Sequence, residues 1–227
     1  MTQRLPGISA CVFDAYGTLF DFASAASRCK DVLGDKAAPL TALWRDKQLQ
    51  YSWLRSLQHR YVDFGQVTAA ALEYAMRALA IEDAALRTRL LNLYRTLEPF
   101  PEVPTVLARL RAAGYRTAIL SNGSPDMLAP LVAHSGIGGL LDAVLSVHEL
   151  GVFKTDPRVY RLAVDRLDIA ADAICFFSSN AWDAWAASDY GMRVVWCNRY
   201  DQHPENLPGR PDAEVHTLTE ALPLLVG

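Results

Sequence analysis

An apolar run that ends in a carboxylate is the strongest chemical signal in this sequence. The run 8–13 is followed by Asp14, and Tyr16 and Thr18 come shortly after it. Its composition predicts a buried strand, and open α/β proteins bind their ligands where the carboxyl ends of such strands emerge. A carboxylate at that place can act as a covalent nucleophile, so Asp14 is a candidate catalytic residue.

Polar side chains follow three further strand-like runs. They are Ser121 and Asn122 after the run 115–120, Lys154 after the run 143–147, and Ser178, Asn180 and Asp183 after the run 173–177. Because parallel strands end on the same side of a sheet, we expect these groups to converge with Asp14. Each has an ordinary explanation by itself, as a turn residue, a surface lysine or an acid in the first turn of a helix. Their convergence favours an active site.

The order of the elements predicts an α/β fold. Strand-like runs at 8–13, 115–120, 143–147, 173–177 and 193–197 alternate with helical patterns at 102–113, 157–167 and 181–190. This alternation predicts a Rossmann-like parallel sheet with helices on both faces. Residues 20–98 contain helical periodicity only, so we expect an inserted all-helical cap there and a catalytic core made of residues 1–19 and 99–227. Pro99 and Pro101 mark the expected linker between them.

Composition excludes several classes of function. The 227 residues are 51% hydrophobic and 21% charged, and their net charge of −3 offers no basic surface for nucleic acid. No apolar run reaches the length of a membrane span, and the N-terminus lacks the apolar centre of a signal peptide. The four cysteines are scattered and form no CxxC pair, which argues against metal or disulfide use and favours a reducing cytoplasm.

The segments that carry these polar residues resemble the L-2-haloacid dehalogenases, a family of the haloacid dehalogenase (HAD) superfamily. The resembling segments are Phe13-Asp14-Ala15-Tyr16-Gly17-Thr18-Leu19, Leu43-Trp44-Arg45-Asp46-Lys47-Gln48-Leu49, Leu54-Arg55-Ser56-Leu57, Ile119-Leu120-Ser121-Asn122-Gly123-Ser124, Lys154-Thr155-Asp156-Pro157-Arg158-Val159-Tyr160 and Ser178-Ser179-Asn180-Ala181-Trp182-Asp183. With the helices between them they cover nearly the whole chain. The family fold is a Rossmann-like core with a helical cap of the four-helix type after the first strand, which agrees with the pattern above.

The resemblance implies hydrolysis of short (S)-2-haloacids to (R)-2-hydroxyacids and halide. Asp14 attacks the carbon that bears the halogen, inverts it and forms an ester, which water then hydrolyses at the Asp14 carboxyl carbon. Lys154 stabilises the carboxylate, while Thr18 and Ser178 hold these two residues in position. Asp183 and Asn180 are the candidates that orient and deprotonate the water, and Tyr160 is expected near Lys154 because it opens the next helix.

The substrate needs donors for its carboxylate, a cation for its halide and an apolar wall. Ser121, Asn122 and the backbone amides of Ala15 and Tyr16 are the expected donors. The resemblance assigns halide binding to Arg45, which without it would read as a solvated helix residue. It also assigns the apolar wall, to Tyr16, Leu49, Phe64 and Trp182. The expected partners are therefore a small haloacid and halide, and the resemblance also implies a homodimer.

Two rival functions remain open at this point. HAD phosphatases use a second acid two residues after the nucleophile to protonate an alkoxide, and a further acid to bind Mg²⁺. Here Tyr16 and Ser179 occupy those positions, so we expect neither a metal nor another cofactor. The second rival is a non-catalytic sensor of carboxylates. Thr155 and Asp46 depart from the family, which usually has a proline and often an amide there.

Overall fold

One parallel sheet carries the residues that follow the predicted strands. The computed structural model describes residues 4–226, and the sheet has the order β3-β2-β1-β4-β5-β6. Its strands are β1 (Ala10–Phe13), β2 (Arg116–Ser121), β3 (Ala143–Ser146), β4 (Ile174–Ser178), β5 (Arg193–Cys197) and β6 (Ala213–Val215). Asp14 therefore leaves β1, which lies at the centre of the sheet between β2 and β4. This is the point at which the strand order changes direction, where open α/β sheets bind ligands.

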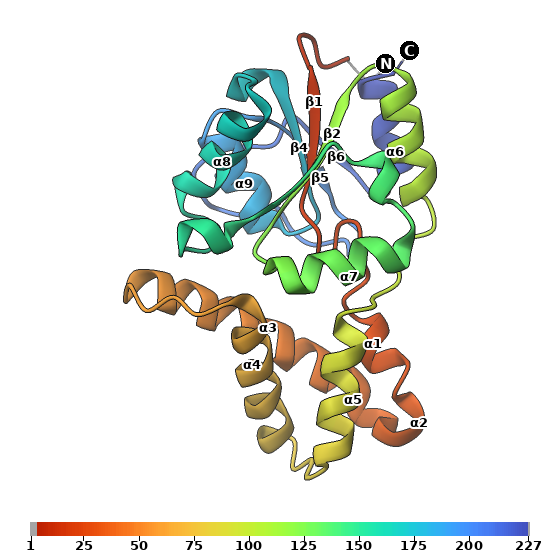
Figure 1. The fold of residues 1–227 in the computed structure, drawn as a ribbon, viewed down its shortest axis with the longest axis vertical. Helices are drawn as coiled ribbons and strands as arrows, with labels where there is room; N and C mark the ends of the chain where they lie inside the picture. The colour runs from red at the N-terminus through yellow and green to blue at the C-terminus, as the bar shows by residue number, and fades with distance from the viewer. Residues whose placement is uncertain (1–3, 227) are drawn as a thin grey trace.

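Helices cover both faces of the sheet. They are α6 (Val103–Ala112), α7 (Pro125–Ser135), α8 (Pro157–Leu167), α9 (Ala181–Asp189) and α10 (Leu218–Ala221). Connections between parallel strands are right-handed, so α6 and α7, which lead away from β1 in one direction, lie opposite α8 and α9. Figure 1 shows α8 and α9 on one side of the strands and α6 on the other. The predicted fold class is confirmed.

A helical cap is inserted between β1 and β2. It contains α1 (Ser24–Ser27), α2 (Lys30–Leu33), α3 (Ala37–Leu57), α4 (Phe64–Ala78) and α5 (Ala84–Tyr94). Asp63 and Asp83 begin α4 and α5 as N-caps, since each accepts a hydrogen bond from a backbone N–H three residues later. In Figure 1 the cap lies beyond the carboxyl ends of the strands.

The two chain segments that join core and cap are paired with each other. The N–H of Phe100 donates to the carbonyl of Leu19 at 2.9 Å, and the N–H of Asp21 donates to the carbonyl of Glu98 at 2.9 Å. Phe20 and Pro99 form an antiparallel bridge between these bonds. We propose that core and cap meet at this paired linker, between residues 19 and 20 and between residues 98 and 99.

The sequence prediction missed several short elements and one longer helix. The strand β6 and the helix α7 were not predicted, and neither were α1 and α2. Strand β6 has three residues and α1 and α2 have four each, too few to display a period of two or 3.6. Helix α7 contains Pro130, which hides its helical pattern. The other strands lie within two residues of their predicted ends.

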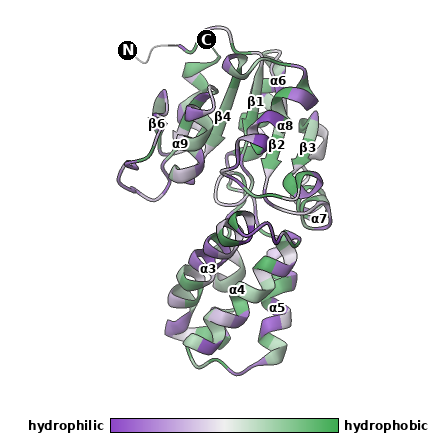
Figure 2. Cartoon of the chain, turned by 90° about the vertical axis from the view of Figure 1, so that its left-hand side faces the viewer, coloured by the Kyte–Doolittle hydropathy of each residue, from purple (hydrophilic) through white to green (hydrophobic). Residues whose placement is uncertain are grey.

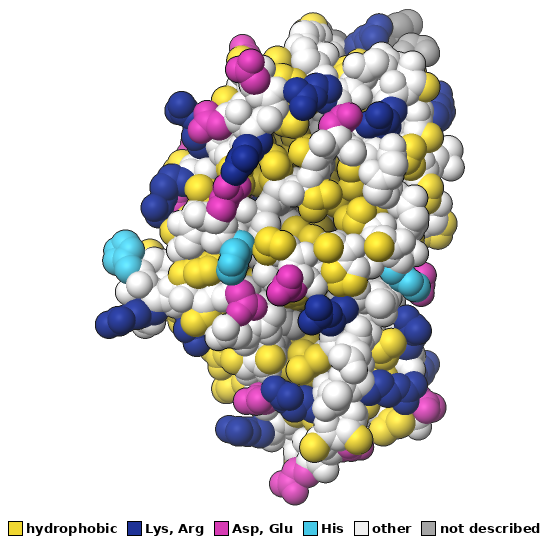
Figure 3. All heavy atoms as spheres, viewed as in Figure 1, with side chains coloured by type: hydrophobic (Ala, Val, Ile, Leu, Met, Phe, Trp, Pro, Cys, Tyr) yellow, Lys and Arg dark blue, Asp and Glu magenta, His cyan; other side chains and the backbone are white. Residues whose placement is uncertain are grey.

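Hydropathy follows the layers. Figure 2 shows the labelled strands β1, β2, β3 and β4 in the green of hydrophobic residues, whereas the helices carry both colours. Figure 3 shows basic and acidic side chains interspersed over the face that it draws. Within residues 4–226, no helix combines the length and the hydropathy that a membrane crossing requires. The signal-peptide prediction concerns in part Met1, Thr2 and Gln3, which lie outside the described residues.

Candidate active site

A buried ammonium group joins two carboxylates at the carboxyl edge of the sheet. Lys154 Nζ lies 2.9 Å from Asp14 Oδ1 and 2.7 Å from Asp183 Oδ2, and the lysine side chain is 1% exposed. Burial alone would lower the pKa of Lys154, but the two carboxylates outweigh it and hold that pKa above its ordinary value. The lysine is therefore a permanent cation beside Asp14.

The second oxygen of Asp14 has two donors of its own. Thr18 Oγ1 donates to Asp14 Oδ2 at 3.2 Å, and Asn180 Nδ2 donates to the same oxygen at 2.8 Å. Thr18 is fixed in turn, because its hydroxyl accepts from the backbone N–H of Ser179 at 2.8 Å. These contacts replace water around the carboxylate and fix the plane in which it lies.

Asp183 supports the lysine from below. Its Oδ2 also accepts from Ser178 Oγ at 3.0 Å, and its Oδ1 accepts from the Tyr160 hydroxyl at 2.8 Å. Burial raises the pKa of Asp183, while Lys154 and Tyr160 pull it the other way. A carboxylate offers about four acceptor positions, so three donors leave one position free on Oδ1.

Arg45 crosses from the cap to the core. Its Nη2 donates to Asn180 Oδ1 at 2.9 Å, and its guanidinium carbon lies 5.2 Å from the ring centroid of Phe22. Because the Asn180 oxygen is occupied by Arg45, the Asn180 nitrogen must be the atom that faces Asp14. One arginine of the cap thus fixes an amide that contacts Asp14.

Unused hydrogen-bond donors lie on the loops that follow β1 and β2. No described residue accepts from the backbone N–H groups of Ala15 and Tyr16. Ser121 Oγ accepts from the Gly123 N–H at 3.0 Å, and Asn122 Oδ1 accepts from the Lys154 N–H at 2.9 Å. The hydroxyl hydrogen of Ser121 and the amide nitrogen of Asn122 remain as donors, so the site offers several donors to an anion without a metal ion.

Aromatic rings line the cap side of the site. The ring centroid of Phe64 lies 5.8 Å from those of both Tyr16 and Phe153. Leu49 lies on α3 four residues after Arg45 and so shares its face of the helix. Burial raises the pKa of Tyr16 well above its ordinary value, which keeps the phenol neutral. Tyr16 therefore contributes an apolar surface and no second acid.

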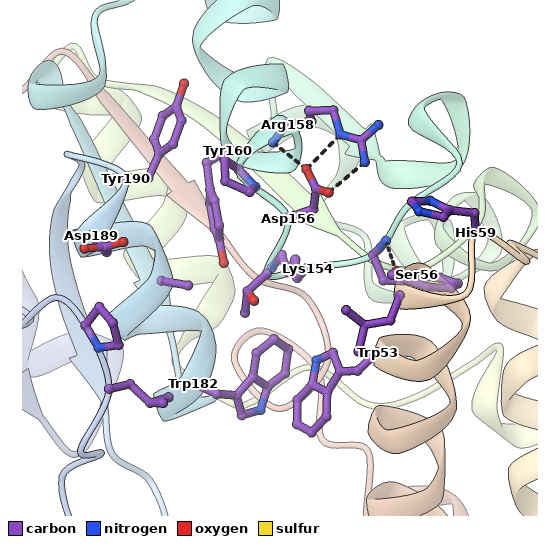
Figure 4. A pocket seen from close by; sticks show the side chains of 17 residues that line it. Trp53, Ser56, His59, Lys154, Asp156, Arg158, Tyr160, Trp182, Asp189 and Tyr190 are labelled. Atoms are coloured by element: carbon purple, nitrogen blue, oxygen red, sulfur yellow. Dashed lines mark hydrogen bonds and ion pairs between the residues drawn. The ribbon is translucent and has the colours of Figure 1, made fainter.

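A groove opens beside these residues. It has a volume of about 970 Å³ and is lined on the core side by Lys154, Tyr160 and Trp182. Figure 4 shows Trp53 of α3 facing Trp182 across it, with the ring centroids 5.5 Å apart and the planes nearly perpendicular. Trp182 thus lines both this groove and the boundary between core and cap.

Most of the predicted site residues form one connected network. Asp14, Thr18, Arg45, Asn122, Lys154, Tyr160, Ser178, Asn180 and Asp183 are joined by the hydrogen bonds given above. Ala15, Tyr16 and Ser121 adjoin the network on the strand-end loops, whereas Leu49, Phe64 and Trp182 contribute apolar surface. Asp46 is exposed, so it does not compete for Arg45, and Thr155 follows Lys154 through a cis peptide bond.

Several contacts were missed from the sequence. Phe153 precedes Lys154 and packs against Phe64, and Phe22 lies under Arg45. Gln48 also contacts Arg45, through its Oε1 at 2.7 Å from Nη1. Only the Gln48 contact has a sequence signal, because residues three apart share a helix face.

The oxygen ligands that this site offers do not suit a magnesium ion. The ammonium of Lys154 stands between the two carboxylates, where it competes with any cation. Ser179, at the position of the phosphatases' metal-binding acid, has a buried hydroxyl without a hydrogen-bond partner among the described residues. A hard dication requires several anionic oxygens, and this set supplies too few.

Comparison with known proteins agrees with this geometry. The chain matches the haloacid dehalogenase-like hydrolase family over residues 8–191, which defines its class. It is 43% identical to (S)-2-haloacid dehalogenase 4A of Burkholderia cepacia, over 96% of this chain and 95% of that protein. The chain belongs to the L-2-haloacid dehalogenase family of these hydrolases, as its sequence motifs predicted.

Solved structures carry the same relationship. A dehalogenase crystal structure matches with a TM-score of 0.96 and 43% identity, covering 98% of this chain and 99% of that one. The L-2-haloacid dehalogenase of Xanthobacter autotrophicus with chloropropionic acid covalently bound matches with a TM-score of 0.89 and 36% identity, covering 96% of this chain and 98% of that one.

Proposed function

We propose that this protein hydrolyses short (S)-2-haloacids to (R)-2-hydroxyacids and halide through an ester on Asp14. The observation that carries the proposal is the carboxylate of Asp14, held by Lys154 Nζ at 2.9 Å, with Tyr16 where a phosphatase has its second acid. A halide leaves as a stable anion and needs no proton, whereas an alkoxide does. The phenol of Tyr16, which stays neutral, is therefore compatible with a departing halide and not with a departing alkoxide.

In the first step, Asp14 attacks the carbon that bears the halogen, from the side opposite the halogen. An ester bond forms, the carbon–halogen bond breaks with its electron pair on the halide, and the centre inverts. Attack by a carboxylate is slow in water because water solvates the attacking carboxylate and the departing halide. Fixed donors that hold Asp14 in line with the carbon–halogen bond therefore supply the acceleration. Lys154, Thr18 and Asn180 are those donors.

In the second step, water attacks the carboxyl carbon of the Asp14 ester. Asp183 takes a proton from this water at the acceptor position that remains on Oδ1, and Asn180 orients the water. Ser178 and Tyr160 hold Asp183 for this task with hydrogen bonds of 3.0 and 2.8 Å. As the ester bond breaks, Asp183 returns its proton to the departing oxygen and the hydroxyacid leaves. The Asp14 carboxyl loses the second water proton to solvent, which restores its carboxylate.

Substrate contacts come from both parts of the molecule. The free N–H groups of Ala15 and Tyr16, together with Ser121 and Asn122, receive the substrate carboxylate. Arg45 binds the departing halide, for which a diffuse cation beside an aromatic ring is suited. Leu49, Phe64 and Trp182 limit the size of the alkyl group. A related enzyme with chloropropionic acid covalently bound supports an enzyme-bound intermediate here.

Isotope labelling tests the covalent route. A single turnover in ¹⁸O water is expected to place the label in Asp14 and leave the first hydroxyacid unlabelled. Asp14→Asn is expected to abolish halide release without unfolding the protein, whereas the matched change of exposed Asp172 to Asn leaves the rate unchanged. Label in the first product, or turnover by Asp14→Asn, would mean that water attacks the substrate directly.

The remaining predictions have simple tests. Metal independence predicts halide release that resists EDTA, and a phosphatase would instead hydrolyse p-nitrophenyl phosphate and lose that activity with EDTA. A sensor would bind haloacid without turnover.

A homodimer would double the mass of about 25.1 kDa measured by light scattering. The cytoplasmic location is tested by fractionation of cells that express the chain.

A further inference from the structure

A buried glutamine of the cap contacts the arginine that reaches Asn180. Gln48 is 1% exposed on α3. Its oxygen accepts from Arg45 Nη1 at 2.7 Å and from the Tyr94 hydroxyl at 3.2 Å, while its nitrogen donates to Thr68 Oγ1 at 2.7 Å. A buried amide is costly unless its polar atoms are satisfied, and these three bonds satisfy both ends of the Gln48 side chain.

The partners of Gln48 fix the orientation of its amide. Thr68 Oγ1 donates to the carbonyl of Phe64 at 2.7 Å, so toward Gln48 it acts as an acceptor. Burial raises the pKa of Tyr94, so its phenol stays protonated and donates. A rotated amide would point its nitrogen at two donors. Only one orientation satisfies the network, and it presents the oxygen of Gln48 to Arg45.

Arg45 is thereby held at both of its terminal nitrogens. Nη1 is bound to Gln48 in the cap, and Nη2 is bound to Asn180 Oδ1 in the core at 2.9 Å. We propose that Gln48 is a positioning residue, which holds the guanidinium of Arg45 where the halide departs. This role rests on the proposed function, in which Arg45 binds the leaving halide. A long side chain that is ordered beforehand loses less entropy when it is used.

The neutrality of the amide matters to this role. A carboxylate at position 48 would also hold Arg45, but it would cancel the charge that attracts the halide. An apolar side chain would leave the charge but release Nη1. A buried amide fixes the guanidinium and preserves its charge, which predicts different defects for Gln48→Glu and Gln48→Met.

Leaving-group dependence is the readout that separates positioning from a structural role. For Gln48→Met we expect kcat/KM to fall about 10- to 100-fold with 2-chloropropionate, and less with 2-bromopropionate, because bromide leaves more easily. Product inhibition by added chloride should weaken in parallel. Gln48→Glu should weaken chloride inhibition further. Thr68→Val, which removes only the hydroxyl that holds Gln48, should show the same pattern on a smaller scale.

The helix provides a matched control. Gln50 is exposed on α3 and accepts from Lys47 Nζ at 2.7 Å, so it repeats the glutamine–cation spacing away from the site. Gln50→Met should leave both the substrate ratio and chloride inhibition unchanged. If Gln48→Met and Thr68→Val change kcat/KM by the same factor for 2-chloropropionate and 2-bromopropionate, or do not change it at all, the positioning role is wrong.

The same assay separates this inference from the proposed function. An unmodified protein that releases no halide from any 2-haloacid overturns the proposed function itself. A protein that releases halide, with chloride inhibition that responds to Arg45→Lys and not to Gln48→Met, overturns only the role of Gln48. Should Gln48→Met fail to fold, Thr68→Val alone tests the positioning role, because it leaves both Arg45 and Gln48 in the chain.

Discussion

The core and the cap contribute opposite kinds of chemistry to one site. The core supplies charges that are buried and paired, namely Lys154 between Asp14 and Asp183 at 2.9 and 2.7 Å. The cap supplies one cation, Arg45, held by neutral groups, and part of the apolar wall, which Tyr16 and Trp182 of the core complete. In the proposed function, the groups that form and break bonds follow the strands of the core, whereas the group that contacts the halide lies on a cap helix.

The largest expected effect comes from breaking the core's charge pairing. Lys154→Met leaves two buried carboxylates without their cation, which should cost about 3–5 kcal/mol of unfolding free energy. Halide release should fall below detection, because Asp14 loses its main donor. Thermal unfolding and a halide assay measure the two effects, and Lys30→Met on the exposed surface of the cap serves as the control. A Lys154→Met protein of normal stability would show that the pair contributes little to folding.

A smaller effect is expected when only the cap cation changes. Arg45→Lys keeps the charge, but one ammonium cannot reach Gln48 and Asn180 as a forked guanidinium does. We expect kcat to fall about 100-fold with the chloro substrate, with a melting temperature close to that of the unmodified protein. Equal losses with chloro and bromo substrates would contradict the division of roles between core and cap.

The pH profile sharpens the assignment within the core. Asp183 must be ionised to take a proton, and burial raises its pKa, so activity should fall with decreasing pH at a higher pH than for an ordinary carboxyl. Because the pKa of Lys154 is raised, activity should be lost at a higher alkaline pH than for a lysine of ordinary pKa. Tyr160→Phe removes a donor to ionised Asp183, which raises its pKa further and should shift the acid limb to higher pH. Tyr74→Phe, on the exposed surface of α4, should leave the limb where it is.

The smallest expected effect concerns the apolar wall. Leu49→Ala should improve kcat/KM for longer 2-haloalkanoates relative to 2-chloropropionate, because each methylene contributes about 1–3 kcal/mol in an apolar pocket. Competition between substrates of different length measures the ratio. No change would mean that Leu49 faces away from the alkyl group.

The sequence predicted the core site better than the cap site for a physical reason. An apolar run that ends in Asp14 or Asn180 is visible in the letters, because parallel strands must end at one edge. The burial around Arg45 is not visible, although its spacing of three residues from Gln48 is. Gln48 and Gln50 each follow a cation by three residues, yet one is buried and the other is exposed. Only the packing of α3 against α4 decides between them, and no local pattern encodes it.

The paired linker explains how the core tolerates so large an insertion. Leu19 and Phe100 are joined by one backbone hydrogen bond, so the chain leaves and re-enters the core at neighbouring points. To the sheet, the whole helical bundle is therefore equivalent to a long hairpin loop, whose closure entropy grows only slowly with length. A chain in which a short turn bridges Asp21 and Glu98 should keep the parallel sheet and lose Arg45, for which we propose halide binding, so the core could be studied without the cap.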